Sequence, residues 1–183
     1  MKYFNVRAVL AFSFLPFSSV APAQEVFPFS GPIAVWWNGG QTCADLPQGR
    51  VEDGVAVQLW QCPGPKINQT WDSVPTGDGK TFLIKNRESG KCLEVINGSY
   101  DDGANIVQRT CNSGDPIQWW YQKPAGTSSF YRGAQVINRV TNKCIEAPSL
   151  APGPGANGQL LRQWSCAKSG DRRNLQIWAN WRR

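Results

Sequence analysis

The chain has 183 residues, a formal net charge of +6 at pH 7 from 19 basic and 13 acidic side chains, and no histidine. This modest positive charge is not the strongly basic composition of nucleic-acid-binding proteins, so we expect no nucleic-acid partner. Without histidine the chain cannot form a Ser-His-Asp triad or a Cys-His pair. The length fits one ordinary domain.

The first 23 residues have the pattern of a secretory signal peptide. Lys2 and Arg7 flank the start of an apolar run over residues 8–17, and Ala21 to Ala23 form a small-x-small cleavage signal. The run is much shorter than the roughly 20 residues of a membrane helix, so we expect no transmembrane segment. We predict a secreted protein cleaved near Ala23, with a proline-containing extension over residues 24–32 and one domain over residues 33–183.

An internal repeat organises this domain. The cysteines form three pairs of similar spacing: Cys43 and Cys62, Cys92 and Cys111, Cys144 and Cys166. A Gln-x-Trp motif follows each pair: Gln69 to Trp71, Gln118 to Trp120, Gln176 to Trp178. Three repeats of about 50 residues therefore fill the domain.

The amino-acid sequence within each repeat predicts an all-β fold. Residues 82–86 alternate in the manner of a strand, and turn residues such as Gly90 and Asn142 separate short β-branched stretches. No C-x-x-C pair suggests a metal, so we expect disulfides and neither metal nor cofactor. Pairing within each repeat is the most economical connectivity, and each bridge removes about 3 kcal/mol of unfolded-chain entropy.

These features resemble the ricin B-type lectin family. The resemblance implies a β-trefoil, in which three repeats of four strands surround a pseudo-threefold axis, with repeats at Ile33 to Val74, Phe82 to Lys123 and Tyr131 to Trp181. It also implies that the tryptophans of the three Gln-x-Trp motifs lie in the core: Trp71, Trp120 and Trp178.

The first repeat carries the full set of residues that the resemblance implies for binding galactose-type sugars. They are an acid after the first cysteine, an amide and an aromatic before the second, and an Asn-Gln pair: Asp45, Gln58, Trp60, Asn68 and Gln69. A pyranose offers rim hydroxyls and one face of C–H bonds, which match a carboxylate, amides and a flat aromatic. We expect Asp45 to accept two hydroxyls and Trp60 to be a platform, although a packing role for Trp60 is the alternative.

The other two repeats depart from this set. The second has Glu94, Val107, Arg109 and Ile117 at the acid, first amide, aromatic and Asn positions, so we expect no binding there. The third keeps an aromatic, Trp164, but its acid is Glu146, and arginine and leucine replace the first amide and the Asn at positions 162 and 175. We treat Glu146 and Trp164 as a second, weaker site.

An enzyme is not expected. A glycosidase needs two carboxylates opposed across a cleft, whereas Asp101-Asp102 and Glu52-Asp53 are adjacent acids in turn-like text. We therefore expect a secreted, non-catalytic lectin that binds galactose or N-acetylgalactosamine glycans on a cell surface or polysaccharide. The alternative is a cell-binding subunit of a bacterial toxin similar to the cytolethal distending toxins, assembled with a catalytic subunit. A trefoil protease inhibitor is disfavoured, because that class does not usually carry three Gln-x-Trp motifs.

Overall fold

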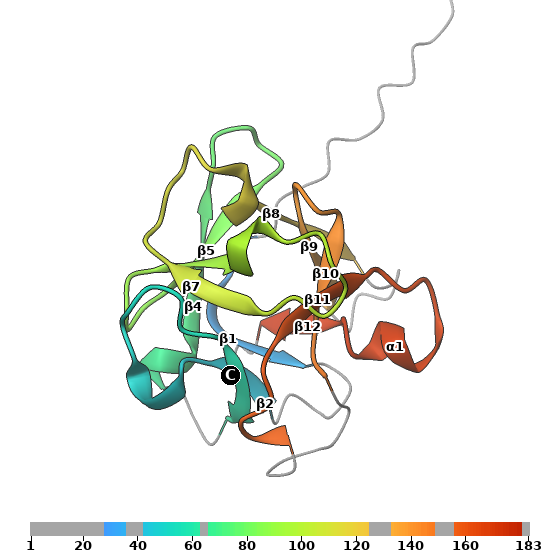
Figure 1. The fold of residues 1–183 in the computed structure, drawn as a ribbon, viewed down its shortest axis with the longest axis horizontal. Helices are drawn as coiled ribbons and strands as arrows, with labels where there is room; N and C mark the ends of the chain where they lie inside the picture. Colours follow the sequence, from blue (N-terminus) through green and yellow to red (C-terminus); the bar gives the residue numbers. More distant parts are fainter. Residues whose placement is uncertain (1–27, 36–41, 63–65, 125–132, 149–155, 181–183) are drawn as a thin grey trace, which may run out of the picture.

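The computed structural model describes residues 28–35, 42–62, 66–124, 133–148 and 156–180. The described residues form twelve short strands, four 3-10 helices and one short α-helix (Figure 1). The predicted signal peptide lies outside them. None of the helices in these ranges is long and apolar enough to span a membrane.

Each repeat contributes four strands. The first has β1 (Ser30–Val35), β2 (Thr42–Asp45), β3 (Gln58–Gln61) and β4 (Thr70–Pro75). The second has β5 (Phe82–Asn86), β6 (Cys92–Val95), β7 (Ile106–Arg109) and β8 (Trp120–Pro124). The third has β9 (Ala134–Asn138), β10 (Lys143–Glu146), β11 (Arg162–Ser165) and β12 (Trp178–Asn180). The helices are η1 (Pro47–Gly49), η2 (Ile67–Gln69), η3 (Ile96–Gly98), η4 (Pro116–Gln118) and α1 (Gly170–Asn174).

Six strands close into a barrel. The antiparallel pairs run from β1 to β4, β5, β8, β9 and β12, and β12 pairs again with β1. The remaining strands form one hairpin in each repeat: β2 with β3, β6 with β7, and β10 with β11. Closure leaves the barrel without an unpaired edge. This arrangement confirms the predicted β-trefoil.

The three motif tryptophans occupy equivalent places in the core. All three are buried, as predicted from the repeat: Trp71, Trp120 and Trp178. Each indole N–H donates to the carbonyl of the residue after the first cysteine, at 3.0, 3.2 and 2.9 Å: Ala44, Leu93 and Ile145. Because a buried indole N–H needs a partner, this bond ties each motif to the hairpin of its own repeat.

A ring of backbone hydrogen bonds joins the repeats to one another. Val57 N–H donates to the carbonyl of Ile106 at 2.9 Å, Ile106 N–H to Leu161 at 2.9 Å, and Leu161 N–H to Val57 at 2.8 Å. All three residues are buried. The ring fixes how the hairpin of one repeat sits beside the hairpin of the next.

The disulfides join cysteines of the same repeat: Cys43–Cys62, Cys92–Cys111 and Cys144–Cys166. The expected connectivity is confirmed. The first strand begins at Ser30, three residues before the expected start of the domain at Ile33. Residues 30–32 pair with β4, and Phe29 packs edge-on against Phe82 with ring centroids 5.7 Å apart, so the end of the predicted extension belongs to the core.

Candidate functional site

A pocket of about 320 Å³ opens on the hairpin of the first repeat. It is lined by residues from β2, η1, β3 and η2 and from the segments beside them: Asp45, Pro47, Gln48, Gln58, Trp60, Lys66 and Asn68. The volume lies at the lower end of the range for small-molecule sites. Four of the five sequence-predicted residues therefore share one pocket, and the fifth, Gln69, lies buried beside Asp45.

Strand pairing explains this convergence. In the β2–β3 hairpin, Asp45 lies opposite Gln58, and Cys43 lies opposite Trp60. Directly opposed residues of antiparallel strands point to the same face, as do residues two apart along one strand. The acid, the amide and the aromatic ring consequently share one face of the hairpin.

Asp45 is the centre of the polar network. It is 3% exposed and accepts hydrogen bonds from three side-chain amides: Gln58 at 2.8 Å, Asn68 at 2.8 Å and Gln69 at 3.0 Å. Asn68 also donates to the carbonyl of Leu46 at 3.0 Å, which fixes its side chain. Since all three side-chain partners are donors, the network suits an ionised carboxylate.

Burial shifts the acid chemistry of this carboxyl group. Desolvation raises the pKa of Asp45 above its ordinary 3.8, and the hydrogen bonds from Gln58, Gln69 and Asn68 partly offset that effect. The positive charge of Lys66, at the edge of the pocket, also acts to lower the pKa.

The two tryptophans near the second cysteine of the first repeat have different environments. Trp71 is fully buried, whereas Trp60 is 39% exposed and lines the pocket. Trp60 is therefore not a core residue, and it lines the same pocket as Asp45.

Three lining residues were not predicted from the sequence: Pro47, Gln48 and Lys66. Gln48 has φ 55°, a left-handed conformation that is unusual for a residue with a side chain. Its counterpart in the second repeat, Asn97, has φ 52° at the same place after the acid. The repeat itself was the signal for this turn, because both residues stand three positions after the acid.

The side-chain oxygen of Gln69 is buried beneath the pocket. In the second and third repeats the motif glutamine oxygen accepts the N–H of the residue after the second cysteine, Asn112 and Ala167. The first repeat has Pro63 there, which has no N–H, and Gln69 Oε1 has no partner among the described residues. Within the described ranges, the motif glutamine oxygen thus accepts a backbone N–H in the second and third repeats and none in the first.

The second repeat lacks an aromatic platform. Its acid, Glu94, accepts Arg109 Nε at 2.8 Å and Gln118 Nε2 at 2.9 Å. Arg109 stands at the position of Trp60 and pairs with the acid.

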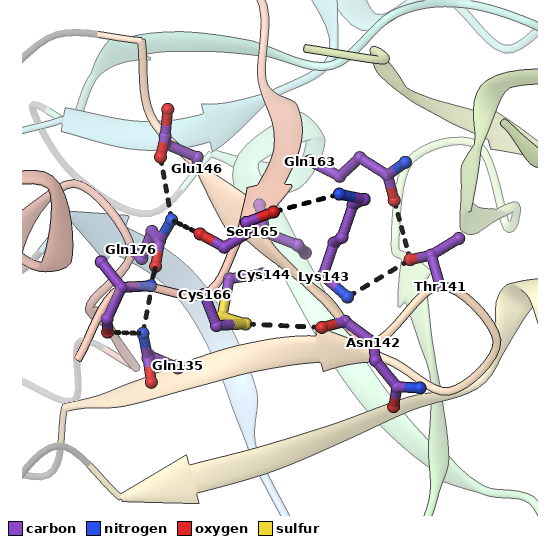
Figure 2. The surroundings of a disulfide bond; sticks show 12 residues. Gln135, Thr141, Asn142, Lys143, Cys144, Glu146, Gln163, Ser165, Cys166 and Gln176 are labelled. Atoms are coloured by element: carbon purple, nitrogen blue, oxygen red, sulfur yellow. Dashed lines mark hydrogen bonds between the residues drawn. A yellow bond between two sulfur atoms is a disulfide. The ribbon is translucent and has the colours of Figure 1, made fainter. Parts of the chain in front are cut away.

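The third repeat keeps the aromatic ring but covers it. Glu146 is buried and accepts Arg162 at 3.0 Å and Gln176 at 2.9 Å; Gln176 and its partners are drawn in Figure 2. The guanidinium carbons of Arg162 and Arg172 lie 4.6 and 4.1 Å from the centroid of the Trp164 ring. The predicted residues Glu146 and Trp164 thus share a cluster with two arginines of the chain itself, Arg162 and Arg172.

Two of the acids in the adjacent pairs, Asp53 and Asp102, form ion pairs with lysines of the next repeat. Asp53 pairs with Lys91 at 2.7 Å, Asp102 with Lys143 at 2.5 Å, and both connect one repeat to the next. Glu52 pairs with Arg50 at 3.4 Å. The described ranges contain no cluster of three side chains able to hold a metal.

Solved structures share this fold. A designed threefold-symmetric protein, ThreeFoil, is 24% identical with a TM-score of 0.65, covering 81% of this chain and 95% of its own. The exo-β-1,3-galactanase 1,3Gal43A from Clostridium thermocellum is 24% identical with a TM-score of 0.67 over 81% of this chain, which corresponds to 29% of the galactanase chain. A chain of the Haemophilus ducreyi cytolethal distending toxin is 14% identical with a TM-score of 0.60, covering 92% of this chain and 87% of its own.

No curated protein sequence matches this chain significantly. The profile of one family does match, in two overlapping segments, residues 37–108 and 67–164, which together span most of the domain. That family is described as the ricin-type β-trefoil lectin domain-like family. Because these matches cover more than half of the sequence, the chain belongs to the ricin-type β-trefoil lectin domain-like family.

Proposed function

We propose that this protein is an exported, non-catalytic lectin that binds galactose or N-acetylgalactosamine residues of glycans through its first repeat. One observation carries the proposal: an exposed tryptophan, Trp60, shares a pocket with Asp45, a carboxylate held by three amide donors. The family assignment supports a lectin as the general class.

The site divides the work of binding a pyranose among its residues. Trp60 offers a flat ring for the C–H face of the sugar, while Asp45 and the amides of Gln58 and Asn68 face its hydroxyls. Two carboxylate oxygens can accept roughly four hydrogen bonds, and Asp45 already accepts three. The pocket therefore leaves one acceptor position at Asp45, and the second expected hydroxyl would replace an amide of Gln58 or Asn68.

A single shallow site of this kind binds weakly. An affinity near millimolar corresponds to about −4 kcal/mol. Effective binding to a cell surface or polysaccharide then needs several sites acting together, through repeated glycans or several copies of the protein.

Export rests on the N-terminal sequence and on the disulfides. Residues 1–23 have the signal-peptide pattern, and disulfides persist in oxidising compartments outside the cytosol. We expect the mature chain to begin at Gln24. N-terminal sequencing of the protein collected outside the cells would test this, and an intact Met1 on that protein would contradict it.

The direct test of the sugar site is calorimetric titration of the purified protein with galactose, with Trp60→Ala as the variant. Loss of the platform should weaken binding about tenfold. Tyr100→Ala is the matched control, because Tyr100 is more exposed than Trp60 and lies outside the pocket lining. Equal binding by a folded Trp60→Ala variant, or no binding by the unmodified protein, would contradict the proposal.

A toxin subunit is the second candidate, and the likeness to the Haemophilus ducreyi toxin chain supports it at the level of fold. Such a subunit would assemble with a catalytic chain and could bind glycans as well. Co-purification from the native source discriminates, because a stoichiometric catalytic partner favours the subunit and its absence favours a free lectin.

A further inference from the structure

A segment of the third repeat borders the candidate site. Gln58 in β3 forms an antiparallel bridge with Leu160. The neighbouring backbone is paired as well, since Leu59 N–H donates to Gln159 at 2.7 Å and Gly158 N–H donates to Leu59 at 2.9 Å. Residues 158–160 thus contact β3 through backbone hydrogen bonds on the side that faces away from β2.

The register places an apolar side chain on the face of the pocket. Opposed residues point the same way, so Leu160 shares the face of Gln58 and Trp60. Leu160 is 40% exposed, although it is a large apolar residue. Beyond this bridge the regular register ends, because Gly158 N–H donates to Leu59 while Gln159 N–H donates to Ala156 at 3.2 Å. An exposed apolar side chain therefore lies next to Gln58 on the face of β3 that carries Trp60.

The threefold repeat provides two internal comparisons. The equivalent bridges join Ala56 to Val107 in the second repeat and Asn105 to Arg162 in the third. The position of Leu160 is thus held by a small residue in one case and a polar residue in the other. A large exposed apolar side chain at this position coincides with the repeat that keeps the sugar-binding residues.

We propose that Leu160 forms a second subsite, which contacts the next sugar ring of a glycan whose terminal galactose-type residue occupies the Asp45 pocket. This inference rests on the proposed function. Two strand spacings separate Asp45 from Leu160, about 9.6 Å, which is longer than one pyranose ring. The subsite selects a disaccharide whose second ring presents its C–H face to the leucine, and a free monosaccharide does not reach it.

The test compares sugars and variants in one titration series. The sugars are galactose and three galactose-terminated disaccharides with β1-3, β1-4 and β1-6 linkages. The variants are Leu160→Ala and Leu160→Asn, which place at this position the residue types that the fold already carries at Ala56 and Asn105. Val74→Asn is the matched control, because Val74 is 38% exposed and lies outside the pocket lining.

We expect at least one disaccharide to bind the unmodified protein about three- to tenfold more tightly than galactose. Both Leu160 variants should remove that advantage and leave galactose binding unchanged, while Val74→Asn should preserve both. If no disaccharide binds more tightly than galactose, or if folded Leu160 variants keep the tighter binding, the proposed subsite is wrong. The galactose site is then unaffected. If galactose itself fails to bind, the proposed function is what fails.

Discussion

The first and third repeats share a four-stranded plan and two of the residues expected to bind sugar, yet the surroundings of those residues differ. Both have a tryptophan two residues before the second cysteine and a motif glutamine bonded to the acid. In the first repeat Trp60 is exposed and lines a pocket. In the third, Trp164 lies beneath two guanidinium groups. The comparison shows that tryptophans at the same position of two repeats have different neighbours: a pocket beside Trp60 and two guanidinium groups beside Trp164.

One position accounts for much of the difference. Gln58 and Arg162 occupy the same place in their repeats, opposite the acid. The neutral amide of Gln58 donates one hydrogen bond to Asp45 and adds no charge. A guanidinium instead pairs with the buried Glu146 and extends over the ring, where cation–π attraction contributes about 0.5–1 kcal/mol or more. Arg172, next to the acid at 3.8 Å, covers the ring from α1.

The largest effect is expected from the acid of the first repeat. Asp45→Asn replaces the ionised acceptor with an amide, so galactose binding should weaken about 10- to 100-fold in titration calorimetry. Glu146→Gln is the matched change in the third repeat and should leave binding unaltered, although it removes the charge partner of Arg162. Equal losses in the two variants would mean that both repeats bind sugar.

A smaller loss is expected when the first repeat is given the arginine of the third. In Gln58→Arg the new guanidinium should pair with Asp45 and cover Trp60, as Arg162 does with Glu146 and Trp164. We expect galactose binding to fall about tenfold. Gln58→Ala removes the amide without adding a covering group, and a loss as large as that of the arginine variant would argue against covering as the cause.

Acid should weaken binding through the carboxyl group of the first repeat. Because burial raises the pKa of Asp45, its protonation begins at a higher pH than for an exposed aspartate, and binding should decline as the pH falls through a midpoint above 3.8. The contribution of Asp45 to the free energy of unfolding changes with pH in the opposite direction. A raised folded-state pKa favours the protonated folded state, so this group alone adds stability toward pH 3.8 and loses that contribution as the pH rises through the folded-state pKa. Titrations from pH 7 to about 4, with circular dichroism of the same samples, separate the two effects.

The smallest effect is a gain. Arg162→Gln combined with Arg172→Ala should uncover Trp164 and allow a second sugar to bind, about tenfold more weakly than the first, because Glu146 is longer than Asp45. Ligand-observed NMR against the Asp45→Asn background isolates this new site. Arg50→Ala, an exposed arginine outside the pocket lining, is the control that should add nothing. If the double variant exposes Trp164 but binds no additional sugar, then Glu146, and not the covering arginines, prevents binding in the third repeat.

Much of the fold was predictable because it repeats in the sequence. The spacing of cysteines and Gln-x-Trp motifs indicates three equivalent units, and one expectation for Trp71 holds for Trp120 and Trp178. The start of β1 was not predictable in this way, because residues 30–32 contain Pro32 and resemble a lead-in more than a strand.

The candidate site was predictable only in part. The acid, amides and aromatic of the first repeat follow from the motif, and they share one pocket or its floor. The covering of Trp164 depends on the direction of two long arginine side chains, one of them from α1, which no repeat pattern encodes. The position of Leu160 beside the pocket depends on pairing with Gln58. These two residues are more than 100 positions apart in the chain.

The central claim is that the open tryptophan, and not the covered one, receives the sugar. The most direct measurement is a crystal structure of the protein soaked with a galactose-terminated disaccharide. The account predicts one sugar per chain, with its terminal ring stacked on Trp60 and a hydroxyl bonded to Asp45. A sugar bound at Trp164 while the ring of Trp60 remains bare would contradict it.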